Sequence, residues 1–268
     1  MDSPTSMILT VTTANSWIYP ELKNWPNPES VEEIIKCVVD CYEAGATIAH
    51  IHLPRGQRAF DIVNGIRDQC DIVIQAGMSS FPIEQRPNDF KSKPDMLSII
   101  LNHHDEHFTQ MHVNQLHTLE EYEKYAKKCA EYKIKPEFEI WHTGSYWNLQ
   151  YLIDKGLIEP PFVLTLFFDW PGGTWSPATP DSYLFRVKYM PENCFHTISV
   201  MSEKQTTIAT LAIANGGNVR VGTEDFPFLY PGKSAKNNAE IVKRMVKLSE
   251  EMDREVASPK EARKILGL

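Results

Sequence analysis

The sequence predicts a single (β/α)8 TIM barrel, and three observations lead to this fold class. Short apolar segments alternate with segments of helical periodicity along the whole chain of 268 residues, as expected for βα units around a parallel sheet. About eight such units can be counted, which is the number in a closed barrel. No change of composition and no Pro/Ser-rich linker separates them, so we expect one domain over residues 1–268.

An open, doubly wound sheet is the alternative architecture for alternating strands and helices. Sheets of that kind that bind dinucleotides carry a glycine-rich GxGxxG turn after the first strand. At this place the chain reads Thr12-Thr13-Ala14-Asn15-Ser16-Trp17, without a glycine. The closed barrel is therefore the preferred prediction.

The predicted strands are short runs of apolar and β-branched residues bounded by turn-forming residues. In chain order they cover residues 8–13, 46–52, 71–76, 96–101, 108–113, 135–141, 162–168, 197–200 and 219–221. This set has one segment more than a barrel needs. We therefore expect only one of the segments 96–101 and 108–113 to be a barrel strand.

The predicted helices combine apolar residues at helical spacing with recognisable end signals. They cover residues 28–44, 59–69, 119–132, 145–155, 204–214 and 235–252. Two of them begin with a capping box, in which Ser30 is followed by Glu33 and Thr118 by Glu121. Gly45 ends the first helix, because glycine readily adopts the left-handed conformation that follows a helix.

Composition and charge exclude several classes of function. The net charge of −8 and the absence of a basic stripe argue against nucleic acid and anionic membrane as partners. No run approaches the roughly 18–20 apolar residues of a membrane span, and residues 1–6 lack the features of a signal peptide. Five cysteines without CxxC spacing indicate reduced thiols. We therefore expect a cytoplasmic protein.

The segment 46–52 places two imidazoles on one face of a predicted strand. Side chains two residues apart in a strand point the same way, so His50 and His52 can bind one metal ion together if their face looks into a cleft. The pair ends an apolar run and precedes a Pro-Arg-Gly loop, which is the place of a functional strand end. The alternative is a pair of hydrogen-bonded core histidines.

Active sites of (β/α)8 barrels lie at the C-terminal ends of the strands, and nearly every predicted strand of this chain ends in polar residues. Any one of these residues could be an ordinary solvated loop residue. Polar residues at nearly all of the strand ends together indicate an active site at the C-terminal end of the barrel. In chain order they are Asn15, Trp17, His50, His52, Ser79, Ser80, His103, His104, Glu139, Trp141, His142, Asp169, Ser202, Glu203, Arg220, Glu224 and Asp225.

The last predicted strand leads into a charged segment that completes a metal site. In a barrel this strand is next to the first and near the second, so Glu224 can supply a carboxylate to the ion bound by His50 and His52. Two histidines and one carboxylate with open positions form a common catalytic site for zinc or Fe(II). Arg220 is flanked by apolar residues and needs a buried anion, for which Asp225 is placed. A purely structural Arg220–Asp225 ion pair is the alternative.

Together these residues resemble the β-keto acid cleavage enzymes, whose best-studied member cleaves 3-keto-5-aminohexanoate with acetyl-CoA. The resemblance covers essentially the whole chain, and its most specific part is the His-X-His pair combined with an Arg-X-Gly-X-Glu-Asp segment. The matching segments are Ile8-Leu9-Thr10, Glu43-Ala44-Gly45-Ala46 before His50-Ile51-His52, Pro171-Gly172-Gly173, residues 216–225 and the C-terminal residues 258–266.

The resemblance implies a (β/α)8 barrel, a homo-oligomer (dimer or tetramer), and Zn²⁺ held by His50, His52 and Glu224. It implies an acyl-transferring cleavage in which a β-keto acid and acetyl-CoA give acetoacetate and a new CoA ester. Zinc would polarise the 3-keto oxygen. Asp225 would act as base or proton carrier, with Arg220 holding Asp225 or the substrate carboxylate.

The chain departs from the family pattern around the substrate. Trp17 stands where the family often has an acidic residue, which favours a substrate without a cationic amino group. Ser79 and Ser80 replace part of a Ser-Thr-Gly-Gly segment, and His103 replaces a small hydroxyl residue. We expect these four residues to bind substrate. His103, His104 and His142 are open to two interpretations, a second metal site or polar lining of the pocket.

Two further departures concern acetyl-CoA. Pro54 stands where the family has a basic residue, with Arg55 one place on, and Val200-Met201-Ser202 replaces a Gly-Ile-Gly segment. Two alternatives to the acetyl-CoA reaction are therefore kept. One is a zinc-dependent C–C lyase or hydrolase of a small oxo acid that does not use CoA. The other is a barrel that binds a small acid without catalysis.

Overall fold

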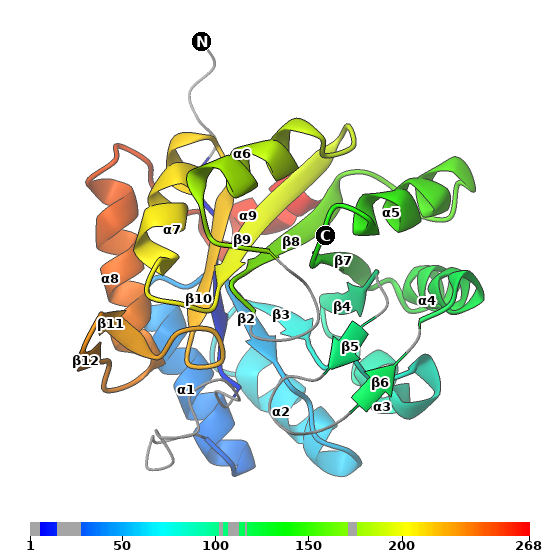
Figure 1. Cartoon of the computed structure of the whole chain (residues 1–268). Helices are drawn as coiled ribbons and strands as arrows, with labels where there is room; N and C mark the ends of the chain where they lie inside the picture. The colour runs from blue at the N-terminus through cyan, green and yellow to red at the C-terminus, as the bar shows by residue number, and fades with distance from the viewer. Residues whose placement is uncertain (1–5, 15–27, 102–103, 107–112, 116, 171–175) are drawn as a thin grey trace.

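The structure, a computed structural model, describes residues 6–14, 28–101, 104–106, 113–115, 117–170 and 176–268. Its centre is a closed barrel of parallel strands in the order β1-β10-β9-β8-β7-β4-β3-β2 (Figure 1). These strands are β1 (Leu9–Thr12), β2 (Ile48–Ile51), β3 (Val73–Ala76), β4 (Met96–Ile100), β7 (Lys135–Ile140), β8 (Phe162–Phe168), β9 (Cys194–Val200) and β10 (Asn218–Gly222). The predicted (β/α)8 fold is confirmed.

Helices surround the barrel, and all six predicted helices are present with small shifts at their ends. They are α1 (Val31–Glu43), α2 (Gln57–Arg67), α4 (Leu119–Tyr132), α5 (Ser145–Asp154), α7 (Gln205–Ala214) and α8 (Asn238–Glu250). One of the two predicted capping boxes is formed, since Ser30 accepts the Glu33 N–H and the Glu33 carboxylate accepts the Ser30 N–H. At the other, Thr118 accepts the Glu121 N–H, but the Glu121 carboxylate accepts the Ile83 N–H and does not close the box. Helix α8 begins later than predicted because the Asn237 side chain caps it by accepting the Glu240 N–H.

Three helices were not predicted, and each begins with a proline in its first turn. They are α3 (Pro87–Lys91), which follows the 3-10 helix η2 (Ile83–Gln85), α6 (Pro180–Lys188) and α9 (Pro259–Leu266). Thr179 and Ser258 cap α6 and α9 through their side chains. Within the described residues, no helix combines the length and the apolar character that crossing a membrane requires.

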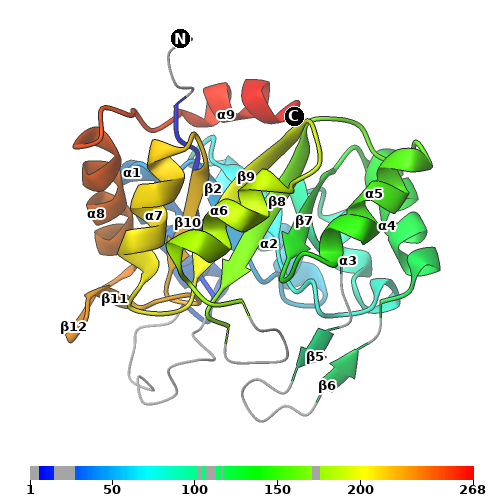
Figure 2. The same ribbon diagram turned by 45° about the horizontal axis from the view of Figure 1, so that its top comes forward.

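The two ends of the barrel differ in what covers them (Figure 2). At the N-terminal end, Ala262 and Leu266 of α9 pack on the apolar layer formed by Ile8, Ile48 and neighbouring residues. At the C-terminal end lie two hairpins, β5 (His104–Glu106) with β6 (Val113–Gln115), and β11 (Phe228–Tyr230) with β12 (Lys233–Ser234). The N-terminal end is thus sealed, and the polar strand ends gather at the other.

The choice between the two strand-like segments 96–101 and 108–113 is settled in favour of the first. β4 pairs with β3 and β7 in the barrel. Of the second segment only Val113 lies within the described residues, and it begins β6 of a hairpin outside the barrel.

Candidate metal centre and active site

The C-terminal ends of β10, β1, β2 and β3 are in register with one another. Thr12 pairs with Gly222 on one side and with His50 on the other, and His50 pairs with Gln75. Gly222 has a φ of 145°, and a Cβ there would lie 2.1 Å from the Thr12 carbonyl oxygen. Only glycine therefore lets β10 approach β1 so closely. This approach brings the loop after β10 over the end of β2.

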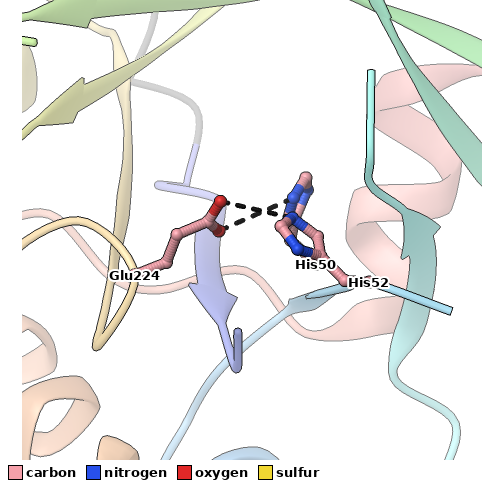
Figure 3. Close-up of side chains that lie close together, drawn as sticks. All are labelled: His50, His52 and Glu224. Atoms are coloured by element: carbon pink, nitrogen blue, oxygen red, sulfur yellow. Dashed lines mark ion pairs between the residues drawn. The ribbon is translucent and has the colours of Figure 1, made fainter. Parts of the chain in front are cut away.

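His50, His52 and Glu224 converge at this place (Figure 3). One Glu224 oxygen, Oε1, is 3.2 Å from His52 Nε2, and the other, Oε2, is 3.8 Å from His50 Nε2. One ligand atom from each residue falls within 4.8 Å of the others. His50 and Glu224 are buried, while the His52 side chain is 22% exposed. Two imidazoles and a carboxylate at this spacing form a donor set that fits zinc or Fe(II).

The protonation of His50 suits a metal ligand. The Gln75 oxygen Oε1 lies 2.8 Å from His50 Nδ1 and can only accept, so Nδ1 carries the proton and Nε2 presents its lone pair. Burial, together with the charge of Arg220, holds the pKa of His50 well below its ordinary value. His50 is therefore neutral at neutral pH, and its free nitrogen faces Glu224.

Room for both imidazoles comes from Gly77, which follows β3. A Cβ at this position would lie 2.5 Å from His52 Cδ2 and 2.6 Å from His50 Nε2. Any larger residue would displace one of the two rings. The absence of a side chain at Gly77 thus makes room for the candidate metal centre.

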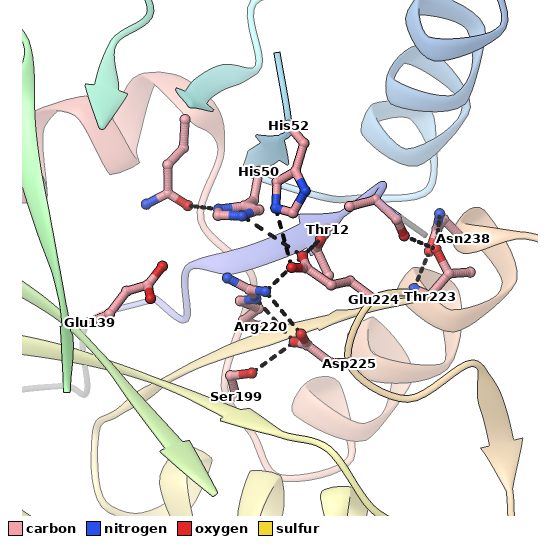
Figure 4. Close-up of polar contacts among 12 residues, drawn as sticks. Thr12, His50, His52, Glu139, Ser199, Arg220, Thr223, Glu224, Asp225 and Asn238 are labelled. Atoms are coloured by element: carbon pink, nitrogen blue, oxygen red, sulfur yellow. Dashed lines mark hydrogen bonds and ion pairs between the residues drawn. The ribbon is translucent and has the colours of Figure 1, made fainter. Parts of the chain in front are cut away.

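Arg220 is the buried cation beneath the cluster (Figure 4). Its Nη2 donates to Glu224 Oε2 at 2.8 Å, and its Nε and Nη2 donate to the two oxygens of Asp225 at 3.0 and 2.9 Å. Thr12 also donates to Glu224 Oε2. Although burial opposes ionisation, the Arg220 charge holds the pKa of Glu224 well below its usual range. Glu224 is therefore ionised, and Arg220 and Thr12 orient its carboxylate.

Asp225 is completely enclosed, and both its oxygens are engaged. Besides Arg220, the Ser199 hydroxyl donates to Asp225 Oδ2 at 2.9 Å. Burial raises the pKa of Asp225 to about 6 in spite of the adjacent guanidinium. The geometry thus contains the predicted Arg220–Asp225 ion pair.

A second carboxylate with a perturbed pKa lies across the barrel mouth. Burial and the neighbouring Glu137 raise the pKa of Glu139 to about 7, although the Arg220 charge opposes this. Trp141 Nε1 donates to Glu139 Oε2 at 3.1 Å, and Ser79 also hydrogen-bonds to Glu139. A buried carboxyl group with a pKa near 7 at the mouth of a barrel is a candidate acid–base catalyst.

The predicted substrate-binding residues are only partly covered by the structure. Trp17 and His103 lie outside the described residues. Ser79 is buried and contacts Glu139, which places it at the barrel mouth. Ser80 follows it on the loop after β3 and is half-buried.

His104 and His142 were the other histidines considered for a second metal site or for the pocket lining. His104 begins β5 in the hairpin outside the barrel. His142 follows β7 and is half-buried. Within the part of the chain that the structure describes, the group that could hold a metal ion contains His50, His52 and Glu224, and His142 is not a member.

A cavity of about 330 Å³ adjoins His52. Pro54 and Arg55, the first of the two departures that concern acetyl-CoA, line it, as do Met78 and Phe81. The cavity is therefore mostly apolar, and Arg55 is the charged residue among its described lining.

The second of these departures, Val200-Met201-Ser202, ends β9. Met201 packs in an apolar cluster with Trp141 and Trp170, and the Ser202 hydroxyl donates to Asp169 Oδ2 at 2.6 Å. This segment is thus tied to the loop after β8.

Several residues of the site have no counterpart among the sequence predictions. Thr12, Gln75, Gly77 and Ser199 were not singled out, and Glu139 was named only as a polar strand end. Gln75 had a usable signal, because it is a polar residue inside the otherwise apolar strand 72–76. The others act through contacts between strands, which spacing along the chain does not reveal.

Among solved structures, the apo structure of ObcA matches with a TM-score of 0.72 at 13% sequence identity, over 90% of this chain and 65% of that chain. An HMG-CoA lyase from Acenitobacter baumannii in complex with coenzyme A and 3-methylmalate matches with a TM-score of 0.58 at 11% identity, over 97% of this chain and 94% of that chain. At such identities the likeness concerns the fold.

Sequence relatives are closer. A 3-keto-5-aminohexanoate cleavage enzyme from Acetoanaerobium sticklandii is 32% identical over 91% of this chain and 92% of that protein. One from Fusobacterium nucleatum is 31% identical over 90% of both. A 3-dehydrocarnitine:acetyl-CoA trimethylamine transferase from Rhizobium meliloti is 24% identical over 90% of both. The family model described as beta-keto acid cleavage enzyme matches residues 11–268. The chain therefore belongs to the β-keto acid cleavage enzyme family.

Proposed function

We propose that this enzyme is zinc-dependent and converts a β-keto acid and acetyl-CoA into acetoacetate and a new CoA ester, within one catalytic domain formed by residues 1–268. The observation that carries the proposal is the convergence of His50, His52 and Glu224 at the C-terminal mouth of the barrel, directly above the Arg220–Asp225 pair. These five residues stand where (β/α)8 enzymes have their active sites.

His50, His52 and Glu224 would hold the zinc ion, which would act as a Lewis acid toward the 3-keto oxygen of the substrate. Thr12 and Arg220 fix one oxygen of Glu224 and leave Oε1 directed toward His52. Gln75 keeps the proton of His50 on Nδ1. Hydrogen bonds within the chain thus orient Glu224 and His50 without an ion.

Asp225 is proposed to move the substrate proton. In the overall reaction the CH2–carboxylate unit of the β-keto acid leaves its acyl group and joins the acetyl group, while the acyl group takes the thiol of CoA. The carbon of that unit must lose a proton to act as a nucleophile, and Asp225 is a carboxylate with a raised pKa near the ligands. Arg220 holds Asp225 and balances its charge.

The substrate is proposed to lack a cationic amino group. Trp17 stands in place of an acidic residue, and the described lining of the cavity beside His52 is apolar apart from Thr13, His52 and Arg55 and contains no carboxylate. Trp17, Ser79, Ser80 and His103 are the proposed substrate-binding residues. A β-keto acid with an uncharged side chain fits these residues best.

The decisive experiment combines metal analysis with a substrate panel. The purified enzyme is analysed for bound metal and then offered β-keto acids with uncharged, anionic and cationic side chains, with and without acetyl-CoA. We expect about one zinc per chain and formation of acetoacetate and a CoA ester only with acetyl-CoA, fastest for uncharged side chains.

Other outcomes separate the alternatives. Consumption of the β-keto acid without acetyl-CoA would identify a CoA-independent lyase or hydrolase. Tight binding of the acid without turnover would identify a non-catalytic barrel. A purified protein that neither contains nor takes up zinc would contradict the metal assignment.

We further propose a homo-oligomer, as a dimer or tetramer, in the reducing cytoplasm. Large apolar side chains are exposed on α5 and α6, two helices that Tyr146 joins by donating its hydroxyl to the Arg186 carbonyl. Trp147 is 65% and Phe185 53% exposed, which is unusual for a surface that meets only water. The five free cysteines support a reducing compartment. Light scattering of the wild type and of Trp147→Ser with Phe185→Ser tests the assembly, because the double variant is expected to dissociate.

A further inference from the structure

A pair of thiols lies on α1, on the side that faces the start of α8. Cys37 is half-buried and Cys41, one helical turn further on, is fully buried. Asn238, the first residue of α8, donates from Nδ2 to Cys37 Sγ at 3.7 Å. Cys37 also lines a cavity of about 310 Å³, together with Lys36, Asp40, Asn237 and Asn238. This thiol is therefore accessible to a small molecule.

The surroundings of Cys37 favour its thiolate. The hydrogen bond from the Cys41 thiol, together with that from Asn238 and the nearby Lys36, lowers the pKa of Cys37 in spite of burial and of Asp40. Cys70 and Cys194 are half-buried like Cys37, but their pKa values are shifted in the opposite direction. Burial raises the pKa of both Cys70 and Cys194. Because the thiolate is the nucleophile, Cys37 is the thiol with the most reactive environment.

Asn238 connects this thiol to the metal centre. Its Oδ1 accepts the Thr223 N–H at 2.9 Å, and its Nδ2, besides Cys37, donates to Thr223 Oγ1 at 3.2 Å. Thr223 directly precedes Glu224, and its hydroxyl donates to the Ala14 carbonyl at 2.9 Å (Figure 4). A displacement of Asn238 would thus release two hydrogen bonds of the residue next to a ligand.

We propose that Cys37 is a modification site for low-molecular-weight disulfides, and that an adduct there weakens the metal centre through Asn238 and Thr223. The Cys37 sulfur attacks one sulfur of the disulfide, a new S–S bond forms as the old one breaks, and the other half leaves as a thiolate. Added thiol reverses the exchange. The attached group occupies the cavity beside Asn237 and Asn238, at the start of α8.

The adduct is not resolved by Cys41. Side chains four residues apart on a helix have Cβ atoms about 5–6 Å apart, whereas a disulfide requires about 3.5–4.5 Å. Cys41 therefore serves as hydrogen-bond donor to Cys37, and the mixed disulfide persists until an external thiol removes it.

The first test is a competition for iodoacetamide, followed peptide by peptide with mass spectrometry. At pH 7 we expect Cys37 to be alkylated faster than Cys70 and at least tenfold faster than Cys194, whose pKa burial raises to about 12, since each pKa unit changes the thiolate fraction about tenfold. Cys41→Ala removes the donor and should slow the labelling of Cys37. Equal rates at Cys37, Cys70 and Cys194 would overturn the proposal.

The second test adds glutathione disulfide to the metal-loaded protein. We expect one adduct on Cys37, a metal affinity about tenfold lower, as for loss of outer contacts to a ligand, and recovery with dithiothreitol. Cys37→Ser keeps an acceptor for Asn238 and should resist, while Cys194→Ser should respond like the wild type. Faster amide hydrogen exchange at residues 222–226 in the adduct is a readout that needs neither zinc nor turnover, so failure of the proposed function remains distinguishable. A complete Cys37 adduct with unchanged exchange and unchanged metal affinity would refute the inference.

Discussion

The two sides of the barrel mouth are held together by different kinds of contact. On the side of β10, β1 and β2, charged and polar groups close in sequence meet, as His50 with His52 and Arg220 with Glu224. On the side of β7 and β8, aromatic side chains from separate segments stack on one another, with the rings of Trp141 and Phe167 4.1 Å apart. The first side contains the residues proposed to hold an ion, and the second gives the site a rigid wall.

Arg186 shows how the second side keeps its shape. This fully buried guanidinium donates to the carbonyls of Ile140 and Phe167 at the ends of β7 and β8. It therefore has backbone carbonyls as its acceptors in place of a carboxylate. Changes on the metal side should thus alter metal binding, whereas changes on the wall should alter stability and titration.

The largest expected effect is that of Glu224→Ala. The variant loses the only carboxylate of the metal-binding group and leaves Arg220 with Asp225 alone, so we expect both bound metal and turnover to fall to background. Metal content by mass spectrometry and the acetoacetate assay measure the change. Glu203→Ala, an exposed carboxylate at the same end of the barrel, is the control and should keep both. A Glu224→Ala enzyme that retains metal would show that the ligand set is wrong.

Asp225→Asn separates catalysis from metal binding on the same side. The amide keeps the shape of the carboxylate but cannot accept a proton, so kcat should fall by about 10²–10⁴-fold while zinc stays bound. Ser199→Ala is the matched control, because it removes only one hydrogen bond to Asp225 and should cost far less. Turnover at the wild-type rate in Asp225→Asn would sink the assignment of Asp225.

Gln75→Ala tests the positioning of His50. Without the acceptor at Nδ1 the ring can rotate and change tautomer, and metal affinity should fall about 10–100-fold, as for other outer partners of metal-binding histidines. Gln75→Glu retains an oxygen acceptor and should bind zinc nearly as well as the wild type. Competition with a chromophoric chelator measures both variants. Equal affinities of Gln75→Ala and the wild type would mean that packing alone orients His50.

The fold was predictable where its signals are local. The capping box at Ser30 and the apolar strand runs predict elements that the structure contains. The helices α3, α6 and α9 were missed although Pro87, Pro180 and Pro259 stand in their first turns, because a proline between polar residues is as common in loops. The hairpins at the barrel mouth have strands of two or three residues, too short for a period to be visible.

The same division holds for the site. His50, His52, Glu224, Arg220 and Asp225 were predictable because two short motifs contain all of them, and barrel closure brings the motifs together. Barrel closure depends on the register between neighbouring strands. The remaining residues of the site could not be predicted because they reach it only through this register. Thr12 and Gln75 matter because they pair with His50 across strands, a relation that no spacing along the chain expresses.

The smallest expected effect on metal binding is that of Glu139→Gln, on the aromatic wall, where the stability of the fold should change instead. The folded pKa of about 7 lies above the ordinary value of 4.5, so the folded protein keeps a proton that the unfolded chain releases between these values. The resulting stability is complete below pH 4.5 and is lost as the pH rises through 7. Glutamine still accepts from Trp141 and has no proton to lose. At pH 8 we therefore expect the variant to be more stable than the wild type by about 3 kcal/mol, with no difference at pH 4.5.

Urea unfolding of both proteins from pH 4.5 to 8 measures this difference, and Glu131→Gln on the exposed face of α4 is the control that should show none. A stability difference that is constant across the pH range would mean that Glu139 does not change its protonation on unfolding, and that the charge of the wall is fixed. A difference that grows with pH would instead place a neutral-pH proton site on the wall, opposite His50, His52 and Glu224. The two sides of the mouth would then have different chemical roles as well as different contacts. The side of β10, β1 and β2 would hold the ion, and the side of β7 and β8 would hold a proton that can be exchanged.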